Sequence, residues 1–191
     1  MAQAIGTNPF IAAIALGRLQ ESTVMNLAQH LTLSGLLACA LLSGGLSNAH
    51  ADSTPERNRT LIEQAFNDWQ AGRGSFFDAV LSPDVVWTIQ GSGPAAGVYR
   101  GREDFLQRAV RPFAQRLAAP IVPNVHAIWA QGDTVVVRWD GKGTAVDGAP
   151  YSNDYVWIFE LRDGRATRVE AFLDLAAYQA VIDRISLADN R

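Results

Sequence analysis

The residues best suited to chemistry in this sequence are Arg138 and Asp140, which lie two positions apart in a segment rich in valine. Alternate side chains of a strand point to the same face, so these two would lie together, roughly 6.6–6.8 Å apart along the backbone. Asp140 can accept or donate a proton, and Arg138 would set its charge state. The pair is our candidate for acid/base catalysis. A structural ion pair in the sheet is the alternative, because such a pair needs no substrate.

His126 is a third catalytic candidate, on a segment that begins after Pro123 and Asn124. Its imidazole titrates near neutral pH, but the sequence identifies no carboxylate partner, so a hydrogen-bonded structural histidine is the alternative. It is the only histidine after residue 51, and the sole cysteine is Cys39. Because no other ligands occur at metal-binding spacing, we expect no metal site and no cofactor.

A binding wall is expected on the neighbouring segment 151–161. Asn153, Tyr155 and Trp157 alternate along this segment and would share one face. We expect that face to align with Arg138 and Asp140, which would give an apolar wall with a few polar groups. Such a wall suits a small, mostly apolar molecule that bears one or two oxygens.

Helices are predicted in the first half of the segment that carries these residues. The stretch Ser53-Thr54-Pro55-Glu56 is a capping box, and the apolar period after it predicts a helix that ends at Gly72. Ser75 can cap a second, shorter helix that ends before Pro83. A third helix is predicted over 102–117, although Pro112 lies near its end.

The second half is predicted to form strands separated by turns. A first strand is expected over 85–89, before a glycine-rich loop over 91–97. Hairpin turn residues then separate four strands, over 121–130, 134–146, 151–161 and 165–172. Asp174 can cap a closing helix. The pattern predicts an α+β domain with an antiparallel meander.

The first 51 residues contain neither Trp nor Tyr, so the core must be built from the rest of the chain. Residues 31–46 form an uncharged apolar run, which is shorter than the roughly 20 residues that span a bilayer. With Ala51 as the last residue before the cut, this run has the layout of a secretory signal peptide. We therefore divide the chain into a signal peptide over 1–51, for which Met25 is the better start, and a domain over 52–191.

Charge and face patterning indicate the partners of this domain. The net charge is −3 at pH 7, and neither a basic stripe for nucleic acid nor a polybasic patch for a membrane is present. Val135, Val137 and Trp139 would lie on the sheet face opposite Arg138 and Asp140. One face can cover the helices and the pocket, and the face with Trp139 can meet a second copy. We therefore expect a homodimer through the sheet.

Two stretches resemble the SnoaL-like branch of the nuclear transport factor 2 superfamily. They are Tyr-Ser-Asn-Asp-Tyr-Val-Trp-Ile-Phe-Glu-Leu-Arg-Asp-Gly-Arg at 151–165 and Ala-Phe-Leu-Asp at 171–174. With the order of helices and strands, the resemblance extends over residues 57–185. It implies a curved antiparallel sheet wrapped by helices into a cone with an apolar pocket. The superfamily includes isomerases, cyclases, dehydratases, epoxide hydrolases and non-catalytic binders, so the fold leaves the function open.

The resemblance also assigns pocket positions. Arg138-Trp139-Asp140 is similar to the Arg-x-Asp motif of limonene-epoxide hydrolases. The second Asp, the Tyr and the Asn of that family fall on Ala171, Trp87 and Ile89. The carboxylate base of ketosteroid isomerases also falls on Ile89. None of these three side chains can transfer a proton, so we expect them to line a binding pocket.

Two classes of function follow from these observations. The first is an exported enzyme that acts on a small, mostly apolar molecule through Asp140, by isomerase, cyclase, dehydratase or hydrolase chemistry. The second is a non-catalytic domain that binds such a molecule or serves as an accessory domain. Arg138 and Asp140, which match the Arg-x-Asp motif, favour the first class. Ile89 and Ala171, which stand where relatives carry catalytic carboxylates, favour the second.

Export gives the first testable expectation. Expressed in a Gram-negative host, the protein should be found in the periplasm with Asp52 at its N-terminus, because the cut is expected after Ala51. Intact-mass measurement of the periplasmic protein checks this. An uncut chain, or a lipid attached to Cys39, would contradict it.

Overall fold

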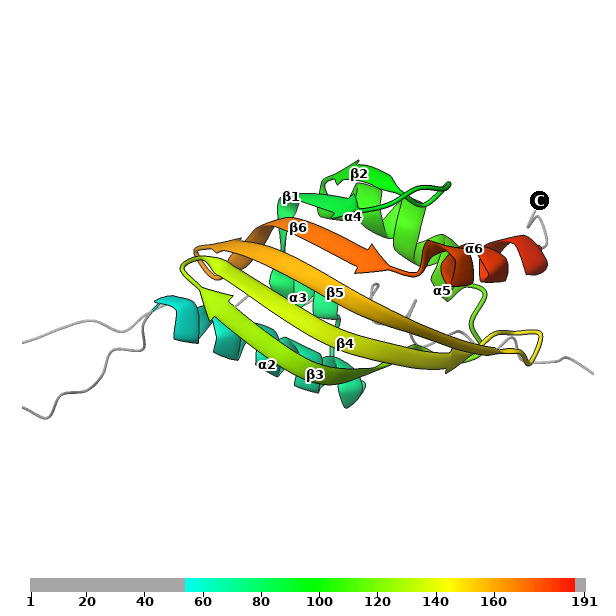
Figure 1. The fold of residues 1–191 in the computed structure, drawn as a ribbon, viewed down its shortest axis with the longest axis horizontal. Helices are drawn as coiled ribbons and strands as arrows, with labels where there is room; N and C mark the ends of the chain where they lie inside the picture. The colour runs from blue at the N-terminus through cyan, green and yellow to red at the C-terminus, as the bar shows by residue number, and fades with distance from the viewer. Residues whose placement is uncertain (1–53, 188–191) are drawn as a thin grey trace, which may run out of the picture.

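The computed structural model describes residues 54–187, which fold into one curved sheet with helices on one of its faces (Figure 1). We call the face that carries the helices the inner face and the opposite one the outer face. This arrangement confirms the predicted α+β class. The predicted signal peptide lies outside the described residues.

The order of elements begins with helices and ends with a helix. The helical segments are α2 (Thr54–Gln70), α3 (Phe76–Val80), α4 (Arg102–Phe105), η2 (Leu106–Val110), α5 (Arg111–Ala114) and α6 (Leu175–Arg184). The strands are β1 (Leu81–Ile89), β2 (Gly97–Arg100), β3 (Val122–Gln131), β4 (Thr134–Thr144), β5 (Pro150–Arg162) and β6 (Arg165–Leu173). The predicted meander corresponds to β3 to β6, and its boundaries agree closely with the expected ranges.

The sheet has the order β2-β1-β6-β5-β4-β3. The four meander strands pair antiparallel with their chain neighbours, as their hairpin turns predict. The sheet is mostly antiparallel, in agreement with the predicted fold class, and the one parallel pairing joins β1 to β6. These strands are far apart in the sequence, and hairpin chemistry gives no information on such a pairing.

The first strand begins at Leu81 rather than at residue 85, and it contains Pro83. The pairing of β1 with β6 shifts register between Leu81 and Val86. Proline is tolerated at such an irregularity, because no regular ladder hydrogen bond is lost there. The short strand β2, which pairs with β1 at the edge, was not predicted.

The third predicted helix is divided by the π-helical segment η2. Pro112 lies in the following segment α5 and has no N–H for an α-helical hydrogen bond. Such a π-helical segment is rare and occurs mostly as a single turn within an α-helix. Tyr178 on α6 donates its hydroxyl hydrogen to the Ala109 carbonyl at 2.7 Å, which ties this segment to the closing helix.

The inner face of β4 carries Val135, Val137 and Trp139, which are 0%, 0% and 2% exposed. The ring of Trp139 lies 5.7 Å from that of Phe66 and 5.2 Å from that of Trp69, both on α2. The prediction that this face meets a second copy was therefore wrong. It is filled by helix α2 and the core of the same chain.

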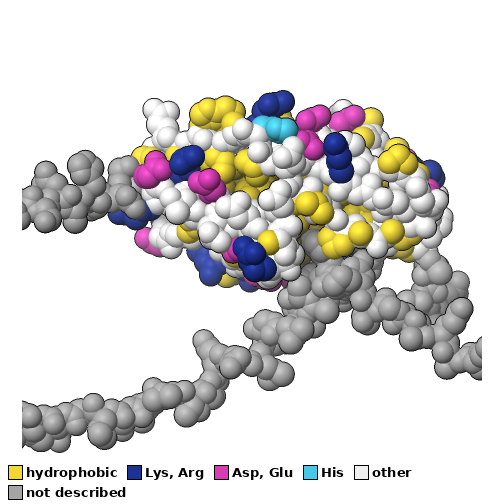
Figure 2. Space-filling view, turned by 90° about the horizontal axis from the view of Figure 1, so that it is seen from below, with side chains coloured by type: hydrophobic (Ala, Val, Ile, Leu, Met, Phe, Trp, Pro, Cys, Tyr) yellow, Lys and Arg dark blue, Asp and Glu magenta, His cyan; other side chains and the backbone are white. Residues whose placement is uncertain are grey.

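The outer face of the sheet is uncovered by the described part of the chain and carries Arg138 and Asp140 (Figure 1). It also exposes Trp129 and Phe172, which are 55% and 42% exposed. Seen along the sheet edge, this side of the molecule carries charged side chains together with the histidine (Figure 2). Within the described residues, helices therefore cover the inner face of the sheet and leave its outer face exposed.

Candidate functional site

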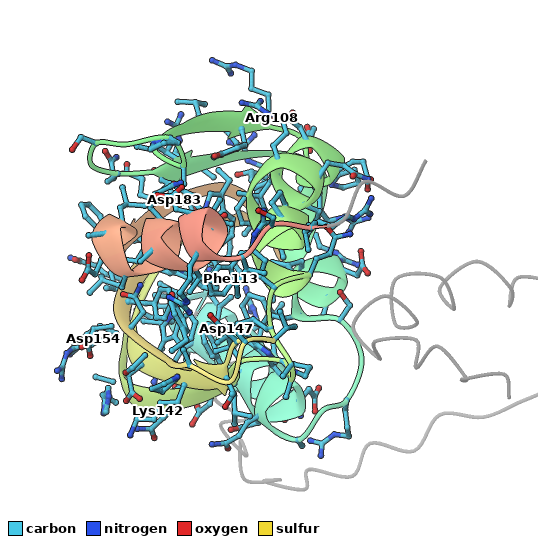
Figure 3. The ribbon with its side chains drawn as sticks, turned by 90° about the vertical axis from the view of Figure 1, so that its right-hand side faces the viewer. Arg108, Phe113, Lys142, Asp147, Asp154 and Asp183 are labelled. Atoms are coloured by element: carbon cyan, nitrogen blue, oxygen red, sulfur yellow. The ribbon has the colours of Figure 1, made fainter. Side chains whose placement is uncertain are left out.

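An apolar cavity of about 120 Å³ lies inside the cone, between the inner face of the sheet and the helices. Strands β1, β4, β5 and β6 form one wall, and side chains from α2, α3, α4, η2, α5 and α6 form the other. Figure 3 looks in from the end closed by α6, where Phe113 lies between this helix and the strands. The Phe113 ring stacks on Tyr178 at 4.8 Å, so α5 and α6 meet at this end.

Five of the six residues predicted to bind a ligand lie at this cavity. They are Trp87, Ile89, Tyr155, Trp157 and Ala171. Their common position follows from strand register, because Ala171 is paired with Ile89 on one side and with Trp157 on the other. The sixth residue, Asn153, is buried but does not line the cavity.

Half of the residues that line the cavity carry aromatic rings. Trp87 stacks on Phe105 at 4.1 Å, and Trp139 stacks on Tyr155 at 3.9 Å. Trp157 stands edge-on between these two pairs, 5.1 Å from Trp87 and 4.7 Å from Trp139. Such offset and edge-to-face contacts hold rings in fixed positions. The wall is therefore preformed without a ligand.

Several wall residues were not predicted. Trp69, Phe77 and Phe105 reach the cavity from helices, and Tyr178 reaches it from α6. The apolar periodicity of these helices showed that the rings face the core. It contained no information on which rings would border a void.

Among residues 54–187, no Asp, Glu, Lys, Arg or His side chain lines the cavity. The indole N–H groups of Trp69, Trp87 and Trp139 are buried and have no acceptor among the described residues. A buried donor without an acceptor costs free energy. The wall is therefore uncharged and has more hydrogen-bond donors than acceptors. Burying a charged ligand against it would cost free energy.

One polar network borders the cavity, at Tyr155. The hydroxyls of Tyr155 and Tyr151 are 2.9 Å apart, and the Asn153 amide donates to the Tyr151 hydroxyl at 2.9 Å. The same amide is bound to the backbone of Asp174, the N-cap residue of α6. Burial raises the pKa of both tyrosines above the ordinary value, so both hydroxyls stay protonated.

The three predicted catalytic residues do not meet at the cavity. Trp139 is paired with Tyr155, whereas Arg138 is paired with Val156. The expected alignment of Arg138 and Asp140 with Asn153, Tyr155 and Trp157 was therefore wrong. The sequence gives the alternation of side chains along each strand, but the register between strands decides which faces combine.

Asp140 instead forms a polar cluster on the outer face. Its carboxylate is 2.5 Å from Nε2 of His126 and accepts a hydrogen bond of 2.8 Å from Asn124. The hydrogen bond from Asn124, followed by that from His126, holds the pKa of Asp140 below its ordinary value. No ion pair joins Arg138 to Asp140, so the alternative structural reading of that pair was also wrong.

A β-bulge explains why the sequence did not identify Asp140 as the partner of His126. The pairing of β3 with β4 shifts register between Val125 and Ala127, which leaves His126 unpaired in the ladder. A bulge re-aims the side chain that it contains. Beside it, a polar groove of about 330 Å³ separates β3 from α2.

Residues 54–187 have neither a metal-binding cluster nor a membrane-spanning helix. No three His, Cys, Asp or Glu side chains stand close enough together to hold a metal ion. None of the helices in this range is both long and apolar enough to cross a membrane.

Comparison with solved structures places the fold among proteins like nuclear transport factor 2. A Burkholderia pseudomallei protein of this type, of unknown function, is 20% identical, with 68% of this chain and 98% of that chain covered and a TM-score of 0.54. TerC, crystallised with polyporic acid, is 23% identical, with 66% and 98% covered and a TM-score of 0.54. A putative SnoaL-like polyketide cyclase from a Jannaschia species is 18% identical, with 68% and 94% covered and a TM-score of 0.53. At these identities the likeness shows the fold alone.

A search of curated proteins found no match to this chain. The family model described as "SnoaL-like domain" matches residues 62–169, a segment that runs from within α2 to within β6. This match covers more than half of the chain and includes most of the cavity wall. The protein therefore belongs to the SnoaL-like family, as the motifs at 151–165 and 171–174 predicted.

Proposed function

We propose that this protein binds a small, neutral, mostly aromatic molecule in the cavity of its cone. The observation that carries the proposal is a preformed wall rich in aromatic rings, to which the described part of the chain contributes no Asp, Glu, His, Lys or Arg side chain. The cavity volume of about 120 Å³ is close to that of an apolar cavity of about 150 Å³ that binds benzene, so its size suits one aromatic ring. Ring contacts and the exclusion of water would supply the affinity.

Acid/base catalysis on a ligand in this cavity has less support. Asp140 and Arg138 lie on the outer face, on the far side of the sheet from the cavity. The tyrosines beside the cavity stay protonated, so they can donate a hydrogen bond but cannot act as bases near neutral pH. The geometry therefore favours binding without proton transfer, which was the second of the two sequence-based hypotheses.

We also propose export and assembly for this binding protein. The signal-peptide pattern supports export. For assembly, the outer face offers Trp129 beside Val136 and Ile158 in one cross-strand row, and Phe172 in the next row. Exposed apolar surface of this kind favours a second copy of the chain over water. The homodimer is thus proposed through the outer face and not through Trp139.

The dimer can be tested at Trp129. Trp129→Glu places a charge in the proposed contact and should give a folded monomer, whereas Trp129→Phe should remain dimeric. Light scattering with far-ultraviolet circular dichroism measures both properties. A monomeric wild-type protein would contradict the proposal.

Trp139→Glu should instead unfold the chain, because it would bury a charge in the core.

Filling the cavity tests the binding proposal itself. Ala171→Leu adds three carbon atoms to the inner face, where Ala171 is 1% exposed and lines the cavity. We expect toluene binding, followed by ligand-detected NMR, to fall by at least tenfold, with an overpacking cost of about 1–3 kcal/mol in urea unfolding. Ala127→Leu is the matched control on the outer face and should leave toluene binding unchanged. Equal loss in both variants would overturn the proposal.

A substitution at Asp140 tests whether the outer face of the sheet takes part in ligand binding. Asp140→Asn should leave toluene binding unchanged, because the outer face does not border the cavity. The depressed pKa of Asp140 adds stability while the carboxylate is ionised and loses it as the pH falls. The wild-type advantage in the free energy of unfolding should therefore be full near pH 6 and shrink below about pH 4. Altered toluene binding, or an advantage that grows in acid, would contradict this account.

A further inference from the structure

We infer that Tyr155 presents its hydroxyl hydrogen to the bound molecule, and that the ligand therefore carries a neutral oxygen acceptor such as a ketone or quinone carbonyl. Asn153 and Tyr151 are positioning residues that set the direction of this hydrogen. The inference rests on the proposed binding function and names the chemical group that the cavity selects. The hydrogen-bond network beside the cavity has one hydroxyl hydrogen more than it has acceptors.

The amide orientation of Asn153 is fixed by the backbone of Asp174. The Asp174 N–H donates to Oδ1 of Asn153 at 2.9 Å, and Nδ2 of Asn153 donates to the Asp174 carbonyl at 2.9 Å. A flipped amide would place donor against donor and acceptor against acceptor. The second hydrogen on Nδ2 therefore goes to the Tyr151 oxygen, at 2.9 Å.

The two tyrosine hydroxyls then have one hydrogen more than they can use. They share a single contact of 2.9 Å, which takes one of their two hydrogens. No other acceptor for either hydroxyl is present among residues 54–187. One hydroxyl hydrogen is left without a partner, whichever way the shared hydrogen points.

The free hydrogen is best placed on Tyr155. Tyr151 is 4% exposed and does not line the cavity, so a free hydrogen there would be buried without an acceptor. If Tyr151 donates to Tyr155, the free hydrogen lies on the residue that lines the cavity. Hydrogen bonds in a chain strengthen one another, so the chain from Asn153 through Tyr151 makes Tyr155 a stronger donor.

The geometry also restricts the acceptor. The Tyr155 ring lies parallel to Trp139 at 3.9 Å, which holds its hydroxyl in one direction. The described residues place no cationic side chain at the cavity to neutralise a carboxylate, and a hydrocarbon would leave the donor unsatisfied. A neutral carbonyl on an aromatic ring satisfies both conditions.

The test uses acetophenone and isopropylbenzene, which have the same skeleton and differ in the carbonyl oxygen. We expect the wild-type protein to bind acetophenone about 3- to 10-fold more tightly, the effect of one net hydrogen bond. Difference infrared spectroscopy should show the carbonyl stretch of bound acetophenone at a lower frequency than in hydrocarbon solvent. Tyr155→Phe should abolish both the preference and the shift.

Tyr178→Phe is the matched control. Tyr178 lines the same cavity, but its hydroxyl hydrogen is used by the Ala109 carbonyl at 2.7 Å. This variant should therefore keep the preference and the frequency shift. Loss of either in Tyr178→Phe but not in Tyr155→Phe would overturn the assignment of the donor.

Tyr151→Phe tests the direction of the chain. If Tyr151 donates to Tyr155, its removal weakens the Tyr155 donor, and the frequency shift should become smaller. If Tyr155 donates to Tyr151, the same variant would free the Tyr155 hydrogen, and the shift would increase. An increase would overturn the roles given to Asn153 and Tyr151. Equal binding of both probes without a shift would contradict the inference alone, whereas binding of neither probe would contradict the proposed function as well.

Discussion

The pairing of Trp139 with Tyr155 across β4 and β5 is the constraint on which the rest of the site depends. It places both rings on the inner face, stacked at 3.9 Å, and Trp157 then stands edge-on to Trp139 at 4.7 Å. A register slip of one residue would turn either strand over and bring Arg138 or Val156 to the cavity instead. The burial of large aromatic surface on one face strongly favours the observed register. That choice also sends every ionisable side chain of β4 to the outer face.

The cavity is consequently a binding site with fixed rings rather than a site with movable acids and bases. Its polar groups are hydroxyl and indole donors, and the one network among them is anchored to the N-cap of α6 through Asn153 and Asp174. The helix that closes the cone thus also orients the tyrosines of its wall. Asp140 and His126 form a separate hydrogen-bonded cluster on the outer face and do not reach a molecule in the cavity.

Sequence reasoning succeeded where a local signal determines the structure. Hairpin turns predicted the meander, Ser75 and Asp174 were found as helix caps, and the motif positions placed Ile89 and Ala171 at the pocket. It failed where distant segments decide the outcome. The faces of β4 and β5 depend on register, and the partner of His126 depends on a bulge, neither of which a single strand reveals. Void space among helix rings depends on packing in three dimensions and leaves no periodic signal in the sequence.

A crystal of the protein soaked with bromobenzene tests the central claim most directly, because anomalous scattering locates the bromine independently of any assay. Our account expects one strong anomalous peak inside the cavity, with the ring among Trp87, Trp157 and Tyr155, the aromatic side chains of its wall. The same soak of the Ala171→Leu variant should show no peak there. A wild-type peak only on the outer face or in the groove beside His126, with an empty cavity, would contradict the account.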